Sequence, residues 1–297
     1  MRYSICLSYD GAEFCGWQIQ PSAPSVQQCL EGALSRLLNR PVSVTGAGRT
    51  DTAVNALGYV AHFDLDGEIP FTQADLCYKL NAILPHSVAV LSVTPVADDF
   101  HARYGARRRE YTYFIHRQKD PFVRAYSWHC GYPVLDFDAM NIACQYLLGT
   151  HDFSCFEKTG TDNKTSICTV FEAFWKPYTP SHLQVMEPEV GTIPETCGRP
   201  WPHEWEGPAP EAWEGRGPKV RRVSGVVSAS GDTYWYFRVS ADRFLRNMVR
   251  AIVGSLIEVG RGKQSPEWIA ELIASGTRGD AGESVPGHAL FLSKVLY

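Results

Sequence analysis

No stretch of this 297-residue sequence approaches the roughly 20 consecutive apolar residues that a membrane-spanning helix requires. The sequence also lacks any Cys-x-x-Cys pair, and its nine cysteines are an odd number, which argues against a zinc site and against a disulfide framework. The N-terminal residues alternate between apolar and polar types, where a signal peptide would have a continuous apolar core. We therefore expect a cytoplasmic protein with reduced thiols, no membrane segment and no bound metal.

Positive charge is in slight deficit overall but is concentrated in one segment. The net charge is −4, which by itself does not favour a nucleic-acid partner. Residues 101–124, however, carry seven basic side chains against two acidic ones. Tyr104, Tyr111 and Tyr113 lie among these charges, as aromatic side chains do on many nucleotide-contacting surfaces. The segment therefore indicates either an RNA-contacting surface or an ordinary solvated strand–loop–strand surface.

The hydrophobic periodicity of the first hundred residues predicts strands and helices in a defined order. The strands are expected at 3–9, 42–45, 57–65 and 88–96, and the helices at 25–39 and 73–84. Ser25 and Thr72 are suitable N-caps for the two helices. The resulting order β-α-β-β-α-β is that of a ferredoxin-like unit, an antiparallel sheet with two helices on one face.

The rest of the chain repeats this order with additions. Strands are expected near 109–116, 167–176, 232–240 and 290–296, and helices from an Asp136 cap to Leu148, after an Asp242 cap, and from Ser265-Pro266. Residues 179–218 are rich in Pro, Gly, Glu and Trp, which predicts an insertion. This insertion is expected to be either a surface loop or a flap that contacts a partner or the substrate.

Length and composition complete the expected architecture. A chain of this length with 44% hydrophobic residues is sufficient for about two domains. We expect an α+β fold with an N-terminal domain over 1–100 and a C-terminal domain over 101–297. Both are expected to be ferredoxin-like βαββαβ domains, placed side by side so that they form a continuous, mainly antiparallel sheet with a central cleft.

The run Gly46-Ala47-Gly48-Arg49-Thr50-Asp51 is the strongest candidate for chemistry. It follows a short segment in which Val42 and Val44 alternate with polar residues, and its glycines permit a tight turn. A guanidinium near the carboxylate of Asp51 would keep that carboxylate ionised in a partly buried site. The alternative interpretation is a surface turn with a weak ion pair.

Several segments, in order, resemble one known family. GAGRTDTAVNALG at 46–58 resembles the signature GRTDAGVHA of the tRNA pseudouridine synthase A family. Five further segments resemble family segments in the family's order: YDGAEFCGWQIQP, FHARYGARRREYTY, GTHDFSCF, FLRNMVRAIVGSLIEVGRGK and VPGHALFLSKVLY. The resemblance implies an enzyme that isomerises uridine to pseudouridine in the anticodon stem and loop of tRNA, without a cofactor and as a homodimer.

The resemblance also implies roles for individual residues. Asp51 is the expected catalytic carboxylate, acting either as a nucleophile or as the base that starts an elimination. Tyr111 aligns with an active-site tyrosine that stacks on the target base, although it or Tyr113 on the same face could instead be a core residue. Arg250 aligns with an arginine that meets the carboxylate, and Leu290 is expected to cap the base pocket.

Helical spacing and local charge extend this set of candidates. Arg250 follows Arg246 by four residues beside an apolar stripe, so an acidic partner is expected for its charge. Arg49 is interpreted as a wedge or a phosphate contact beside a flipped-out nucleotide, because a stacked uridine cannot reach a pocket. The expected phosphate contacts on the RNA are Arg107, Arg108 and Arg109.

Three positions depart from the family pattern. Ala53 and Ala289 stand where glycine is usual, and Asn55 stands where histidine is usual. These departures motivate an alternative hypothesis, a catalytically silent RNA-binding paralogue of the same fold. A dinucleotide-binding enzyme is a weaker alternative, because a G-x-G-x-x-G loop would need glycine at the position of Asp51.

Overall fold

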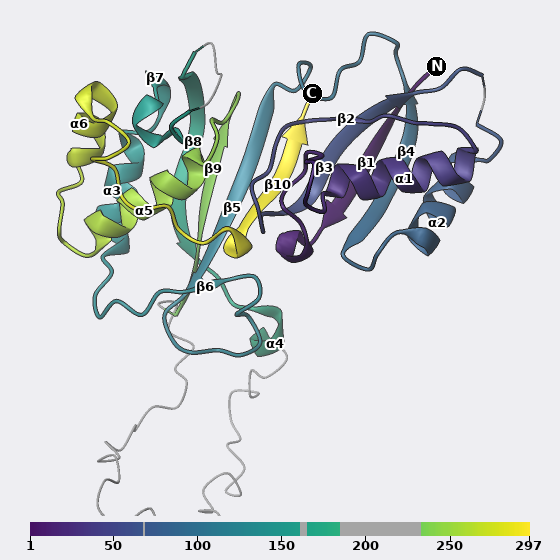
Figure 1. Ribbon diagram of the computed structural model, residues 1–297. Helices are drawn as coiled ribbons and strands as arrows, with labels where there is room; N and C mark the ends of the chain where they lie inside the picture. Colours follow the sequence, from purple (N-terminus) through teal and green to yellow (C-terminus); the bar gives the residue numbers. More distant parts are fainter. Residues whose placement is uncertain (68, 161–164, 185–232) are drawn as a thin grey trace, which may run out of the picture.

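The computed structural model describes residues 1–67, 69–160, 165–184 and 233–297. Its strands form one sheet in the order β4-β1-β3-β10-β5-β9-β8-β7, with β2 paired to β3 and β6 paired to β5 (Figure 1). Neighbouring strands along the main path are antiparallel except for β3 and β10, which are parallel. The protein is therefore a mixed α/β protein built on one large, mostly antiparallel sheet.

The first part of the chain supplies one end of the sheet and two helices. Its elements are β1 (Arg2–Tyr9), α1 (Val26–Leu38), β2 (Thr45–Gly46), β3 (Asn55–Asp64), α2 (Gln73–Ile83) and β4 (Val88–Val96). Both predicted caps are confirmed, since Ser25 Oγ accepts the N–H of Gln28 and Thr72 Oγ1 accepts the N–H of Asp75. In Figure 1, α1 and α2 lie against the β4–β1–β3 part of the sheet.

The prediction of a strand over 42–45 is wrong for most of its length. Val42 and Val44 are buried as their alternation suggests, but their N–H groups bond to side chains of α1. Ser35 Oγ accepts from Val42 (2.9 Å) and Glu31 Oε1 accepts from Val44 (2.8 Å). Because the helix takes these donors, only the two residues of β2 remain to pair with β3.

The second part of the chain builds the other end of the sheet. Its elements are β5 (Arg108–His116), β6 (Trp128–His129), α3 (Phe137–Gln145), β7 (Gly149–Asp152), β8 (Ile167–Pro177), α4 (Ser181–Gln184), β9 (Tyr234–Ala241), α5 (Met248–Gly260), α6 (Trp268–Ser275) and β10 (Leu290–Leu296). Short 3-10 turns lie at Gly11–Glu13, Ser154–Phe156 and Gly287–Ala289. The periodicity did not predict β6 and β7, whose four or fewer residues are too short for a pattern.

The predicted Asp242 cap is also wrong. α5 begins at Met248, with Asn247 in a left-handed conformation as its N-terminal neighbour. Asp242 instead accepts the N–H of Thr169 (2.8 Å) and of Arg243 (2.7 Å) through Oδ1. An N-cap signature and a side chain that fixes a neighbouring strand look the same in sequence, because both present a short carboxylate to backbone N–H groups.

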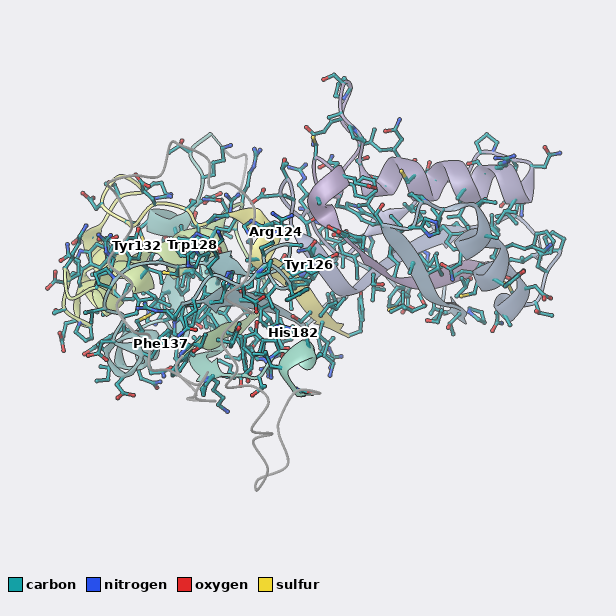
Figure 2. The ribbon with its side chains drawn as sticks, turned by 90° about the horizontal axis from the view of Figure 1, so that it is seen from below. Arg124, Tyr126, Trp128, Tyr132, Phe137 and His182 are labelled. Atoms are coloured by element: carbon teal, nitrogen blue, oxygen red, sulfur yellow. The ribbon has the colours of Figure 1, made fainter. Side chains whose placement is uncertain are left out.

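The last strand joins the two parts of the chain. β10 lies between β3 and β5, with Phe291 opposite both Asn55 and Thr112. The buried apolar side chains of both parts form one cluster that extends from Ile5 in β1 to Ile252 in α5. The connection between β5 and β6 also contributes to this junction. Its residues Arg124 and Tyr126 lie where the two halves of the molecule meet in Figure 2, and Tyr126 donates to Asp10 Oδ2 (2.9 Å).

Three further expectations concern the insertion, membrane-spanning helices and metal sites. Of the predicted insertion, only α4 and the residues just before it are described; residues 185–218, including Trp201, Trp205 and Trp213, lie outside the described residues. In the described ranges, no helix has the length and apolar character needed to cross a membrane. The same ranges contain no group of three or more His, Cys, Asp or Glu side chains that could hold a metal ion.

Candidate active site

The loop that carries Asp51 is fixed on one side by strand β3. The Ala47 N–H donates to Val60 O (2.8 Å), and the buried phenol of Tyr59 donates to Gly48 O. Gly46 is required here because a Cβ atom at this position would lie 2.1 Å from the Tyr59 hydroxyl oxygen. The turn leaving β2 is therefore a consequence of close packing against β3.

A second set of contacts fixes the residue immediately before the aspartate. Thr50 O accepts the N–H of Trp17 (3.3 Å), and Thr50 Oγ1 shares a hydrogen bond with Tyr9 Oη (2.9 Å). A Cβ at Gly16, whose φ is +90°, would lie 2.2 Å from Thr50 O. The backbone around Asp51 is thus held on both sides while its own side chain remains 27% exposed.

The cation beside Asp51 is not the predicted one. Arg246 Nε lies 3.9 Å from Asp51 Oδ1, at the outer limit of an ion pair, and its side chain is half exposed. Arg250 Nε donates to Val285 O (2.6 Å), and within the described residues Arg250 has no carboxylate within 4.0 Å. The prediction of an acidic partner for Arg250 is therefore wrong, because the backbone carbonyl of Val285 accepts its hydrogen bond.

The reason for this difference lies in where α5 begins. The four-residue spacing places Arg246 and Arg250 on one helical face only if both belong to the helix. Arg246 precedes the left-handed Asn247 and lies outside α5, so its side chain leaves in another direction. Arg246 is part of the segment FLRNMVR. Because the helix was predicted to begin soon after Asp242, Arg246 was assigned to the helix and its position beside Asp51 was not predicted.

Tyr111 and Tyr113 have different environments on β5. Tyr113 is fully buried and donates to Pro286 O (3.1 Å), so it is a core residue. Tyr111 is 9% exposed, and its ring meets Phe244 edge-on with centroids 5.0 Å apart. Burial, and then the negative charge of Asp51, raise the pKa of the Tyr111 phenol, whereas Arg109 acts in the opposite direction. Tyr111 is therefore a protonated phenol close to Asp51 at neutral pH.

Leu290 and two of the unusual residues lie at the junction formed by β10. Leu290 is buried at the start of β10, opposite Tyr113 on β5. Asn55 accepts the Gly11 N–H through Oδ1 (2.8 Å) and donates through Nδ2 to His288 O (2.7 Å). This buried amide therefore connects the segment before α1 with the segment that leads to Leu290. Ala289 is fully buried in the same turn.

Arg109 is not available as a phosphate contact, which corrects its predicted role. Its Nη2 donates to Ala47 O (2.9 Å) and Arg103 O (2.6 Å), and its Nη1 donates to Asp242 O (2.7 Å). Burial lowers the pKa of this guanidinium, whereas the backbone carbonyls that accept its hydrogen bonds favour its charged form. Arg109 thus connects the Asp51 loop with the 101–106 loop and with the residues after β9.

The other predicted arginines do not form a common patch with Arg109. Arg108 points to the opposite face of the sheet, where its Nη2 pairs with Glu172 Oε2 (2.9 Å), because neighbouring residues of a strand alternate. Arg107 is exposed, and its backbone N–H donates to Leu296 O (2.8 Å). Arg49 is exposed at the tip of the Asp51 loop. Arg49 and Arg107 therefore remain predicted RNA contacts.

Comparisons with known proteins extend over the same segments. A family model described as tRNA pseudouridine synthase matches residues 5–105 and 143–297. The chain is 41% identical over 297 residues to tRNA pseudouridine synthase A of Bacteroides thetaiotaomicron, a similarity covering 100% of this chain and 90% of that protein. It is 38% identical over 296 residues to the protein of the same name from Porphyromonas gingivalis, with 100% and 97% covered.

A more distant relative gives the same result. The chain is 35% identical over 301 residues to tRNA pseudouridine synthase A of Bacillus licheniformis, with 100% of this chain and 99% of that protein covered. The similarities therefore run through the loop of Asp51, strand β5 with Tyr111, and the closing segment with Leu290. Because its sequence is similar to these proteins along its whole length, the chain belongs to the tRNA pseudouridine synthase family.

Proposed function

We propose that Asp51 is the catalytic carboxylate with which this chain isomerises uridine. As a family member, the chain is an isomerase that converts uridine to pseudouridine in tRNA. This reaction breaks the bond between the base and the sugar and rejoins the base through carbon. The observation that supports Asp51 most is its position, a partly exposed carboxylate on a loop whose backbone is fixed on both sides, with Arg246 and Tyr111 beside it.

The proposed roles follow from charge and burial. The carboxylate acts as a nucleophile or as a base in the first step, and both choices need it ionised and close to the sugar or base. Tyr111 retains its proton, so its ring is suited to stack on the uracil and its hydroxyl to donate a hydrogen bond. Leu290 closes the apolar side of the pocket in this proposal, and Arg250 helps to hold the loop between α6 and β10 through Val285 O.

The proposed substrate is a uridine of the anticodon stem and loop, flipped out of its stack at a cost of a few kcal/mol. We also propose that the chain has two ferredoxin-like domains, over 1–100 and 101–297, with the substrate cleft between them. The strand orders β4-β1-β3-β2 and β10-β5-β9-β8 support this division. In each set of four, the fourth, first, third and second strands along the chain lie side by side in that order, as in a ferredoxin-like unit. A homodimer and a cytoplasmic location, where tRNA and reduced thiols occur together, complete the proposal.

The Asp51→Asn variant tests the proposal. It keeps the size and shape of the side chain but removes its charge and replaces one acceptor oxygen with a donor, so product formation should fall by at least about 100-fold. The measurement is single-turnover conversion of uridine to pseudouridine in transcribed tRNA, with the modified positions mapped. The variant should still bind tRNA within about threefold of the unmodified protein, since the loop backbone is held by other residues.

Asp66→Asn is the matched control, because Asp66 is an exposed carboxylate after the end of β3 and should be neutral for turnover. Unchanged turnover in Asp51→Asn would reject the proposed role of this residue. If the unmodified protein bound tRNA but formed no pseudouridine, the silent RNA-binding alternative would replace the enzymatic proposal.

A further inference from the structure

We propose that a pocket at the N-terminal end of α5 binds a backbone phosphate of the RNA strand that enters the active site. This inference rests on the proposed function and adds a binding site to it. The pocket has a volume of about 600 Å³. It is lined by Lys158, Thr159, Asn247, Arg250, Arg278, Gly279 and Ser284.

The charge of the lining favours an anion. Three cationic side chains line the pocket, and no carboxylate is among the lining residues. Within the described ranges, none of Lys158, Arg250 and Arg278 has a carboxylate within 4.0 Å. Cations gathered with no counter-charge among the described residues repel one another, and a bound phosphate would relieve this repulsion.

The hydrogen bonds inside the pocket use Ser284 as an acceptor and leave its hydroxyl proton to be donated to another group. Ser284 Oγ accepts from Asn247 Nδ2, and it also accepts from Arg278 Nη2 (2.8 Å). A hydroxyl has two acceptor lone pairs and one proton, so both lone pairs of Ser284 are in use and its proton needs another acceptor. A phosphate oxygen in the pocket satisfies this need.

The start of α5 adds a partial positive charge at the same place. The helix has 13 residues, and the side chain of Asn247, whose Nδ2 donates to Ser284 Oγ, makes no capping hydrogen bond to it. The N–H groups of the first helical turn are therefore not capped by this side chain. Helix N-termini of this kind bind phosphate groups through both their N–H groups and their dipole.

The position of the pocket identifies the RNA backbone as the source of the phosphate. The Lys158 N–H donates to Arg246 O (3.0 Å), and the side chain of Arg246 reaches Asp51. One residue thus connects the pocket with the proposed catalytic carboxylate. When the sugar of the target nucleotide lies at Asp51, an adjacent phosphate of the same strand can occupy the pocket.

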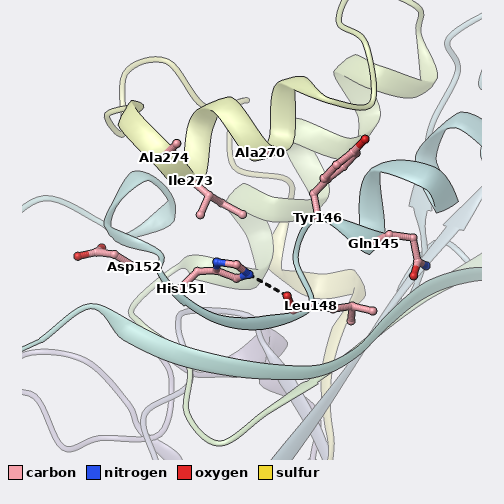
Figure 3. A pocket seen from close by; sticks show the side chains of 8 residues that line it. All are labelled: Gln145, Tyr146, Leu148, His151, Asp152, Ala270, Ile273 and Ala274. Atoms are coloured by element: carbon pink, nitrogen blue, oxygen red, sulfur yellow. Dashed lines mark hydrogen bonds between the residues drawn. The ribbon is translucent and has the colours of Figure 1, made fainter.

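A second pocket of similar size lacks the cationic lining of the first. It has a volume of about 500 Å³ and lies between α3, β7 and α6, with Leu148, Ala270 and Ile273 in its lining (Figure 3). It contains Asp152 but no lysine or arginine, and the ring of His151 bonds to Leu148 O (2.8 Å). This pocket therefore does not have the chemistry of a phosphate site.

Lys158→Ala and Lys158→Glu test the inference, because Lys158 is exposed and its replacement should leave the fold intact. We expect tRNA binding at low salt to weaken about tenfold in Lys158→Ala and further in Lys158→Glu. Loss of one phosphate contact should also reduce the slope of log K against log salt concentration by about 0.7 to 0.9. Lys176→Ala, an exposed lysine near the end of β8, is the control and should change neither quantity.

The outcomes separate this inference from the proposed function. Binding is measured with transcribed tRNA in the Asp51→Asn background, so the result does not depend on turnover. An unchanged salt slope in both Lys158 variants would reject the phosphate site, whatever the activity of Asp51→Asn. Binding of inorganic phosphate that is lost in Lys158→Ala, while the tRNA slope stays the same, would indicate a free-anion site and would also overturn the inference.

Discussion

The residues around Asp51 differ in their burial and in the number of hydrogen bonds that hold them. Tyr59 and Thr50 are buried and bonded, whereas Asp51 and Arg246 are partly exposed and 3.9 Å apart. A pair at this distance and exposure contributes at most about 1 kcal/mol to stability. The position of the carboxylate therefore depends on the backbone of its loop and only slightly on the arginine beside it.

Ala53 is the clearest case of local strain in this loop. Its φ is +61°, in the left-handed region that costs an L-residue about 1–2 kcal/mol. Ala53→Gly removes this strain but increases the entropy of the unfolded chain, at a cost of about 0.4–1 kcal/mol. We expect a net gain of about 0.5 kcal/mol in the free energy of unfolding, seen as a higher urea midpoint with an unchanged m-value.

Ala53→Val is the opposing control, because a β-branched side chain is less well tolerated in the left-handed region and should lower the midpoint. A lower midpoint for Ala53→Gly than for the unmodified protein would show that the methyl group contributes more by packing than its backbone conformation costs.

At the level of elements, the site is assembled by side chains that bond to the backbone of other segments. Asn55 connects the turn before α1 with the turn before β10, and Arg109 connects three segments near Asp51. These residues do not need to touch a substrate to affect the reaction. They set the relative position of loops that no single strand or helix controls.

Arg109 is a positioning residue in this view, and Arg109→Lys tests it. Lysine retains the charge but cannot reach Ala47 O, Arg103 O and Asp242 O at once, because it lacks the planar fork of donors. We expect kcat to fall by about 100-fold through misplacement of the Asp51 loop, with the Kd for tRNA changed by less than about threefold. Single-turnover rates and binding isotherms measure the two quantities separately.

Arg107→Ala is the matched comparison on the same segment. Arg107 is exposed, so its loss should weaken tRNA binding and reduce the salt slope while leaving kcat within about twofold. If Arg109→Lys weakened tRNA binding and Arg107→Ala lowered kcat, Arg109 would be the RNA contact and Arg107 the positioning residue.

For the molecule as a whole, stability depends on one sheet completed by the last strand of the chain. β10 pairs with β3 on one side and β5 on the other, so folding of the first and last parts is coupled. Buried histidines lie on both sides of this junction, His62 in β3 and His116 in β5. Burial lowers the pKa of both imidazoles, and the charge of Arg2 adds to this for His62.

This arrangement predicts how stability depends on pH. Below an unfolded-state pKa of about 6.5, the unfolded chain binds protons that the folded chain does not, so the free energy of unfolding falls as pH falls. Above about pH 7 both states are neutral at these residues, and no slope arises from them. Urea unfolding at several values between pH 7.5 and 6 measures the effect.

His62→Asn should make that slope smaller, because asparagine offers an acceptor for the Ala102 N–H, as His62 Nδ1 does (3.1 Å), without titrating. His86→Asn, at an exposed position, should leave the slope unchanged. Equal slopes in His62→Asn and the unmodified protein would exclude His62 as a source of the pH dependence.

Elements whose signals are local could be predicted from the sequence alone. The alternation of β1, the apolar faces of α1 and α2, and the caps Ser25 and Thr72 all depend on residues within a few positions of one another. The motif around Asp51 and the resemblance to the family also came from contiguous segments. The strand, the two helices and their caps were predicted correctly because neighbouring residues in the chain carry their whole physical cause.

Which of these segments contact one another could be seen only in the folded chain. Arg109 bonds to a carbonyl 62 positions before it and to another 133 positions after it, and Asn55 bonds to one 233 positions away. Neither the choice of Arg246 over Arg250 beside Asp51 nor the commitment of Arg109 to the backbone leaves a periodic signal. Such contacts arise when separate elements pack against each other, because the partners of a side chain are then chosen by geometry across the fold.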